Sequence, residues 1–70
     1  MERQSVDSSM IAAIGYDPEK QILECEFKRG AVWQYEGVPQ TVYQGMMASE
    51  SIGKYFNAAI KGQYPETEVG

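Results

Sequence analysis

The chain has 70 residues, of which ten are acidic and six basic, so its net charge is −4; it contains one cysteine and no histidine. A chain of this length suffices for one domain built around a single hydrophobic core. One cysteine excludes an internal disulfide, and the lack of histidine removes the commonest metal ligand and general base. No apolar run approaches the ~18–20 residues that a membrane-spanning helix needs.

These counts also set expectations about partners and location. We expect no metal, no cofactor, no membrane contact and no enzymatic activity, and a cytoplasmic protein. The acidic balance repels nucleic acid on average, so RNA binding would need a local basic patch.

In chain order, residues 10–16, 21–27 and 31–36 are expected to be strands. The second and third alternate between apolar and polar residues, which is typical of a strand with one buried face, and the first is an uncharged segment before a turn. The segment 17–20 reads as a turn with Pro18 after Asp17. The segment 28–30 reads as a hairpin loop, with Gly30 where a left-handed backbone is needed. The sequence therefore predicts a three-stranded antiparallel meander.

The predicted loop lengths set the pairing register, and the register assigns side chains to the two faces of the sheet. The face expected to be buried holds Met10, Ala12, Ile14, Leu23, Cys25, Phe27, Ala31, Trp33 and Tyr35. The opposite, mixed face holds Ile11, Ala13, Ile22, Glu24, Glu26, Val32, Gln34 and Glu36.

After Pro39 the apolar residues recur every three to four positions, which predicts helices over residues 40–48 and 51–61. Gly45 inside the first helix indicates close backbone packing or a weak helix. The predicted fold is an α+β domain over residues 1–70, with a core from about 6 to 65, mobile ends, and both helices packed on one sheet face. Its expected core includes Trp33, Tyr35, Tyr55 and Phe56.

Five polar side chains form the candidate contact patch for RNA, which is weighed against ordinary solvated charge. Lys54, Asn57 and Lys61 recur along one side of the second helix, and Lys28 and Arg29 lie at a hairpin tip. No catalytic group is expected. Without a histidine to activate it, Cys25 fits a small core residue better than a nucleophile, and Glu24, Glu26 and Glu36 fit a solvated face.

Several short segments, in their order and spacing, resemble the KTSC domain family. They are Val6-Asp7-Ser8-Ser9, Ile14-Gly15-Tyr16-Asp17, Trp33-Gln34-Tyr35, Val38-Pro39, Tyr43, Gly53-Lys54-Tyr55-Phe56-Asn57, Ile60-Lys61 and Tyr64-Pro65. That family is named for the C-terminus of some lysyl-tRNA synthetases and also occurs as small bacterial and phage proteins. Its central pattern is Tyr-x-Tyr, and Trp33 stands here in place of the first tyrosine. The resemblance implies no established activity, although RNA binding has been suggested for the family.

The expected function is a non-catalytic binding module that acts through protein contacts or self-association. Strand 10–16 contains no charge and no proline and is expected at a sheet edge, where a second copy would pair with it unless the N-terminal segment covers it. The alternative function is an RNA-binding accessory module that uses the patch of Lys28, Arg29, Lys54, Asn57 and Lys61.

Overall fold

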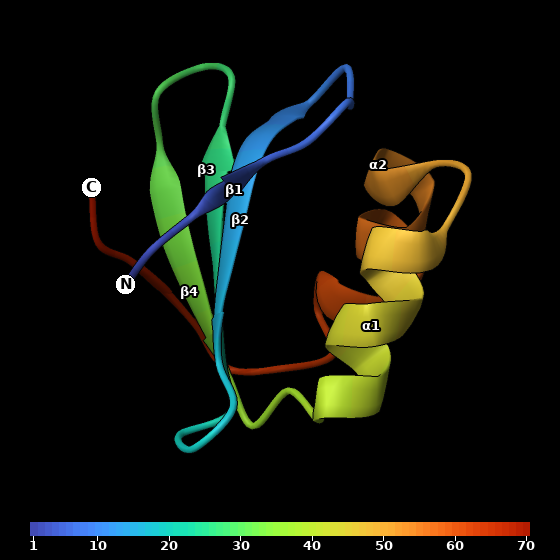
Figure 1. Cartoon of the computed structure of the whole chain (residues 1–70). Helices are drawn as coiled ribbons and strands as arrows, with labels where there is room; N and C mark the ends of the chain where they lie inside the picture. The colour runs from blue at the N-terminus through green and yellow to red at the C-terminus, as the bar shows by residue number, and fades with distance from the viewer.

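A computed structural model describes all residues, 1–70, as one antiparallel sheet with helices on one face (Figure 1). The elements, in chain order, are β1 (Gln4–Ser5), β2 (Ile11–Asp17), β3 (Ile22–Phe27), β4 (Val32–Glu36), α1 (Gln40–Ala48), α2 (Ile52–Tyr55), η1 (Phe56–Ile60) and β5 (Glu66–Glu68). The five strands lie in the sheet in sequence order. The predicted α+β class is therefore confirmed, with two more strands than expected.

The central hairpin forms as the sequence indicates. Cys25 pairs with Trp33 and Leu23 with Tyr35, which is the register that a three-residue loop imposes. The loop ends at Gly30, whose φ of 104° is open to glycine but strained for other residues. The expected division of β3 and β4 between two faces is thus confirmed.

The register of β2 against β3 differs from the expected one along the whole strand. A turn over residues 17–20 would place Tyr16 opposite Gln21, but the turn spans 18–21 and Tyr16 pairs with Leu23. Ile14 pairs with Cys25, as the face assignment requires, but the register shifts between Ile11 and Ala13, so that Ile11 pairs with Phe27. This bulge turns Ile11 onto the buried face, where it is fully buried and where Ala12 was expected. Met10, also expected there, packs against the core and is partly buried. An irregular extra residue leaves no trace in simple alternation, which is why the prediction failed here.

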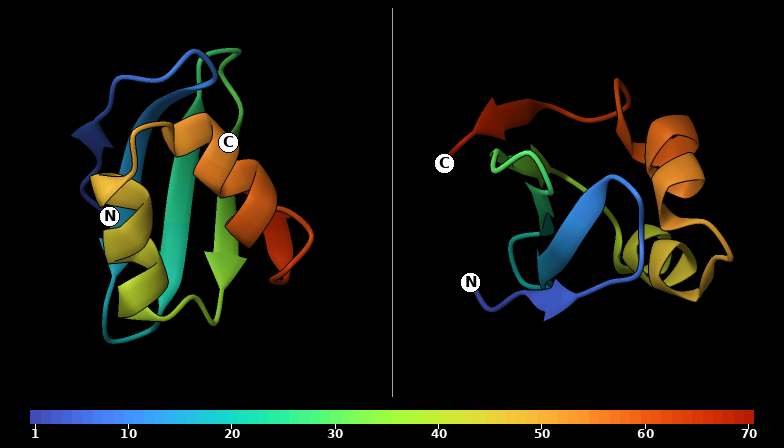
Figure 2. Two further views of the ribbon diagram at one scale, coloured as in Figure 1. Left: turned by 90° about the vertical axis from the view of Figure 1, so that its right-hand side faces the viewer. Right: turned by 90° about the horizontal axis from the view of Figure 1, so that it is seen from above.

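Both ends of the chain form short strands that the sequence pattern does not predict. β1 pairs with β2 through Gln4 opposite Ile14 and Ser5 opposite Ala13, so residues 10–16 are not a sheet edge. At the other side, β5 pairs with β4, and the right-hand view of Figure 2 shows both terminal strands flanking the central three. Strands of two and three exposed residues carry no apolar alternation, so the sequence pattern does not reveal them.

The first predicted helix is confirmed over Gln40–Ala48, and the second is confirmed as α2 continued by η1, a turn of π-helix. The Ser51 hydroxyl caps α2 by accepting a hydrogen bond from the Lys54 backbone N–H at 3.3 Å. A Cβ added at Gly45 would lie 2.5 Å from the Tyr55 hydroxyl oxygen. Gly45 thus lets the second helix approach the first, which confirms the close packing expected there.

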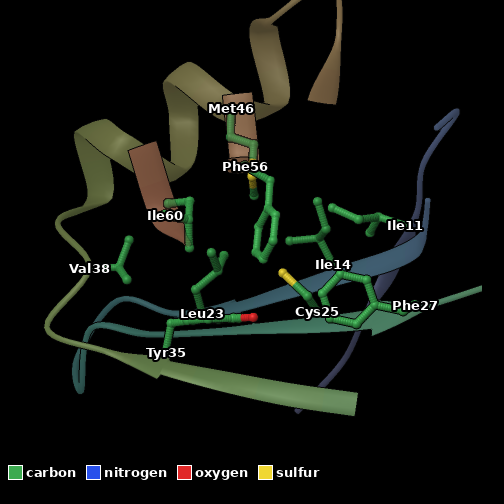
Figure 3. Packing of buried hydrophobic residues seen from close by; sticks show 10 residues of the cluster. All are labelled: Ile11, Ile14, Leu23, Cys25, Phe27, Tyr35, Val38, Met46, Phe56 and Ile60. Carbon is green, nitrogen blue, oxygen red and sulfur yellow. The ribbon is translucent and has the colours of Figure 1, made fainter. Parts of the chain in front are cut away.

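The core lies between the sheet and the helices, as Figure 3 shows. Phe56 from η1 meets two strand residues edge to face, with ring centroids 5.5 Å from Phe27 and 5.4 Å from Tyr35. Tyr35 and Phe56 are buried, as expected of core residues. Trp33 and Tyr55 pack against this core but are only partly buried.

Candidate functional site

The single thiol lies inside the core and is not a candidate nucleophile. Cys25 is fully buried between the sheet and the helices. Burial, reinforced by the neighbouring Glu24 carboxylate, raises the pKa of the Cys25 thiol from 9.0 to about 12. The thiolate is the reactive form of cysteine, so this environment suppresses the reactivity of Cys25. No three histidine, cysteine or acidic side chains gather into an arrangement that could hold a metal ion.

The acidic face of the sheet is occupied by the N-terminal segment. The Arg3 guanidinium lies 3.3 Å from a Glu24 carboxylate oxygen and 3.7 Å from one of Glu26. The Gln34 side-chain amide donates a hydrogen bond of 2.7 Å to Glu24, whose side chain is nearly buried. Gly15 makes room for this segment, since a Cβ there would lie 2.7 Å from the Glu2 carbonyl oxygen. These carboxylates therefore serve structure on this face.

A first hollow lies between the N-terminal segment before β2 and the start of α2. We call it the polar hollow; its volume is about 370 Å³. It is lined by Asp7, Ser8, Ser9, Met10, Glu50, Ser51, Ile52, Gly53, Lys54 and Asn57. The Ser8 hydroxyl is fixed here because it accepts hydrogen bonds from the Met10 and Ile11 backbone N–H groups, both at 3.2 Å. Ser8 and Ser9 before β2 and Ser51 before α2, far apart in the chain, line the same hollow.

A second hollow lies between η1, the β3–β4 hairpin and β5. We call it the aromatic hollow; its volume is about 270 Å³. It is lined by Met10, Phe27, Arg29, Trp33, Tyr35, Phe56, Asn57, Lys61 and Glu66. The Arg29 guanidinium carbon lies 5.2 Å from the centre of the Phe27 ring, a cation–π distance. Cations and flat apolar walls therefore share one small space.

The two hollows adjoin, since Met10 and Asn57 line both of them. Together they form what we call the groove, which follows α2 and η1 on the side where these helices meet the ends of β2 and β3. The left-hand view of Figure 2 shows α2 and η1 lying across the sheet. The groove brings aromatic, cationic and hydroxyl side chains together.

Four of the five residues predicted to contact RNA line the groove. Lys54 lines the polar hollow, Arg29 and Lys61 the aromatic hollow, and Asn57 both. Lys28 is exposed and lines neither hollow, so the structure does not bring it to the others. The sequence patterns missed the contributions of Met10 and Glu66, which depend on the bulge in β2 and on the pairing of β5.

Opposite charges balance along the groove. Its cations are Arg29, Lys54 and Lys61, and its anions are Asp7, Glu50 and Glu66. Every ion pair in the molecule is made by Arg3 on the opposite face of the sheet, so none of these six side chains is paired within the protein. The groove therefore offers separate positive and negative contacts and no net charge.

The five-stranded antiparallel sheet with two helices on one face defines a small α+β domain. The chain belongs to the KTSC domain family, whose profile matches residues 7–64. No helix of the chain combines the length and apolar character needed to cross a membrane.

Relatives of the chain include both small proteins and segments of larger ones. It is 41% identical to a KTSC domain protein from Yersinia pestis whose crystal structure superposes with a TM-score of 0.93, over 99% of this chain and 97% of that one. It is 45% identical to an uncharacterized protein of Stutzerimonas stutzeri, over 91% of this chain and 90% of that protein. It is also 40% identical to part of a lysine–tRNA ligase from a Nostoc species, over 83% of this chain but only 10% of the ligase.

Proposed function

We propose that the domain is a non-catalytic binding module whose groove accepts an extended segment of a partner protein. The observation that carries this proposal is the adjoining pair of hollows, one aromatic and one polar, with Met10 and Asn57 common to both. An aromatic cavity gives an anchor for an apolar side chain, and a neighbouring polar cavity gives hydrogen bonds to the residues beside it. Such a division of labour suits a peptide.

The charge balance of the groove supports a protein segment over a nucleic acid. A polyanion gains affinity when several phosphates each meet a cation, and in this groove each cation is offset by a carboxylate. The net charge of −4 adds a general repulsion. A peptide of mixed charge meets no such penalty and can use both signs for specificity.

RNA is the second candidate, because relatives of the chain lie within proteins named lysine–tRNA ligase. Trp33 lines the aromatic hollow and is only partly buried, so a base can stack on its ring, and Arg29 and Lys61 line the same hollow. Under this candidate we expect affinity no better than the nonspecific range of ~10⁻⁴–10⁻⁶ M at physiological salt.

One titration separates the two candidates. Trp33 is the only tryptophan and lines the groove, so its fluorescence reports occupancy directly. We would select binders from a random peptide library and titrate them, and in parallel titrate single-stranded oligouridylate and tRNA, at two salt concentrations. Lys61→Gln and Asn57→Ala should weaken binding of the true ligand, whereas the control Lys28→Gln, outside both hollows, should leave it unchanged.

Peptide binding that is lost in the groove variants supports the proposal. Salt-dependent RNA binding that falls with Lys54→Gln and Lys61→Gln, without peptide binding, overturns it in favour of RNA. Binding that survives every groove variant and falls with Lys28→Gln would place the interaction at the hairpin tip.

A further inference from the structure

Trp33, which lines the aromatic hollow, carries a hydrogen-bond donor that no group of the protein satisfies. The indole Nε1–H of Trp33 is buried and has no acceptor within hydrogen-bond distance. Arg29 and Lys61, which line the same hollow, form no ion pair. Folded proteins satisfy nearly all of their buried polar groups, because a buried donor without an acceptor is costly. Arg29 and Lys61 are exposed and solvated, so this cost applies to the Trp33 donor alone. Two cations that form no ion pair, beside apolar walls, favour a negatively charged ligand in this hollow.

The walls of the hollow indicate which kind of group the ligand carries beside its negative charge. The rings of Phe27, Trp33 and Phe56, with Met10 and Tyr35, form a largely apolar lining. The volume of about 270 Å³ lies below the ~300–1,000 Å³ typical of sites for small-molecule ligands. The cavity thus fits a single side chain better than a whole cofactor.

We propose that the aromatic hollow binds the C-terminal residue of a partner polypeptide, taking its large apolar side chain between the rings and its free α-carboxylate on Arg29 and Lys61. This inference rests on the proposed function and specifies the ligand of the same groove. Because cations and apolar walls line one small cavity, charge and apolar bulk must come from one residue of the ligand. Within an unmodified polypeptide, only an apolar residue at the C-terminus combines the two.

A singly charged carboxylate fits this cavity better than a phosphate group. Glu66 also lines the hollow and would repel a dianion more strongly than a monoanion. Carboxylate capture by arginine is geometrically specific, since the planar guanidinium can donate two parallel hydrogen bonds. Trp33, whose buried indole N–H has no acceptor within the protein, lines the same cavity.

The direction of the rest of the partner follows from the groove. Asn57 lines both hollows, and its amide can both donate to and accept from a peptide backbone. The residues before the C-terminus therefore run from the aromatic hollow past Asn57 into the polar hollow. There Lys54, Asp7 and Glu50 provide charged contacts for side chains of either sign.

The test uses matched peptide probes and the intact protein. Acetyl-glycyl-phenylalanine is compared with its C-terminal amide and with acetyl-glycyl-alanine, by Trp33 fluorescence and by the indole N–H resonance in ¹⁵N-labelled protein. We expect the free acid to shift the indole resonance and to bind about tenfold more tightly than the amide, the effect of losing charge-assisted hydrogen bonds. Removing the phenyl ring should weaken binding by a similar factor.

Variants locate the interaction. Arg29→Gln and Lys61→Gln should each reduce the difference between the acid and the amide, because each removes one donor for the carboxylate. Lys28→Gln, next to Arg29 in the chain but outside the hollow, should preserve the difference. Thermal unfolding of each variant identifies any change that arises from loss of folding.

Three outcomes overturn the proposal: equal affinity for acid and amide, an acid preference that survives both Arg29→Gln and Lys61→Gln, or oligouridylate shifting the indole resonance where the peptides do not. The first two leave the proposed function standing if library peptides still bind the groove through internal residues. The third, together with failure of the library, overturns the proposed function as well.

Discussion

The two faces of the sheet are built from the same strands but held by different forces. On the covered face, Leu23, Cys25 and Tyr35 are buried against helices by apolar packing. On the open face, Glu24 and Glu26 are covered by a thin N-terminal segment through Arg3. Apolar burial is worth far more per contact than partly exposed ion pairs. Stability therefore depends mainly on the covered face, and substitutions on the open face should cost less stability.

Removing a ring from the covered face is expected to have the largest effect. Phe56→Ala should lower the free energy of unfolding by about 3–5 kcal/mol, because it empties the centre of the core between Phe27 and Tyr35. A small domain has little stability to spare, so the variant should be largely unfolded at 37 °C by circular dichroism. Retention of a cooperative unfolding transition near that of the parent would show that the core lies elsewhere.

A second change tests the contact between the two helices that cover this face. Gly45→Ala places a methyl group 2.5 Å from the Tyr55 hydroxyl oxygen, so the tyrosine or the helix must shift. We expect a loss of about 1–3 kcal/mol in chemical denaturation, despite the better helix propensity of alanine. The double variant Gly45→Ala with Tyr55→Leu removes the opposing hydroxyl and should recover part of that loss. A stabilising Gly45→Ala would contradict the close packing.

On the open face, deletion of residues 1–5 removes β1 and Arg3 together. We expect a loss of about 1–2 kcal/mol from the missing hydrogen bonds, and a new tendency to self-associate through β2, whose residues 11–16 carry no charge. Analytical ultracentrifugation over a concentration series measures that tendency. Gly15→Ala, which pushes the same segment away without shortening the chain, is the matched variant. A truncated protein that stays monomeric at high concentration would exclude association through this edge.

A smaller effect is expected when only the charge contacts of the open face are removed. Arg3→Ala should cost less than about 1 kcal/mol, since the arginine side chain is one-third exposed. The cost should shrink as sodium chloride is raised, because salt screens the attraction to Glu24 and Glu26. The control Lys20→Ala removes an exposed turn cation that forms no ion pair and should change neither stability nor its salt dependence.

The smallest effect on stability at neutral pH concerns the thiol of the covered face, which stays protonated. Its pKa of about 12 in the folded protein, against 9.0 in the unfolded chain, means that the folded state binds more protons between these values. The Cys25 contribution to stability is therefore complete below pH 9 and is lost as the pH rises towards 12. Alkylation by iodoacetamide at pH 8 should proceed only at the rate of unfolding. Rapid labelling of the folded protein would contradict the burial.

Sequence periodicity predicted the parts of the fold that carry long apolar patterns. The hairpin of β3 and β4, helix α1 and the cap at Ser51 follow from alternation, spacing and turn chemistry within short stretches. β1 and β5 escaped prediction because strands of two and three exposed residues are held by pairing alone. The bulge that buries Ile11 is a local irregularity with no periodic signature.

The sequence predicted most of the polar residues of the candidate site but not the cavity that they line. The spacing of Lys54, Asn57 and Lys61 predicted one side of a helix, and the structure brings the predicted Arg29 of the hairpin into the same groove while leaving Lys28 outside it. That Trp33 lines a cavity beside these cations depends on how η1 packs over β4, a tertiary relation that no single segment encodes. The sequence analysis placed Trp33 only in the core and did not predict that it also lines the groove.

The order of the strands also has a consequence for how the chain folds. Strands β1 to β4 pair with one another in sequence order, and short loops join them. Contacts across short loops favour rapid folding. β5 instead pairs with β4 across both helices, with Glu68 opposite Trp33, and its loop closure carries a larger entropic cost. We infer that β5 docks last and opens first, so that amide hydrogens along its pairing with β4 exchange soonest. Because β5 carries Glu66, which lines the aromatic hollow, opening of β5 also opens one side of that hollow.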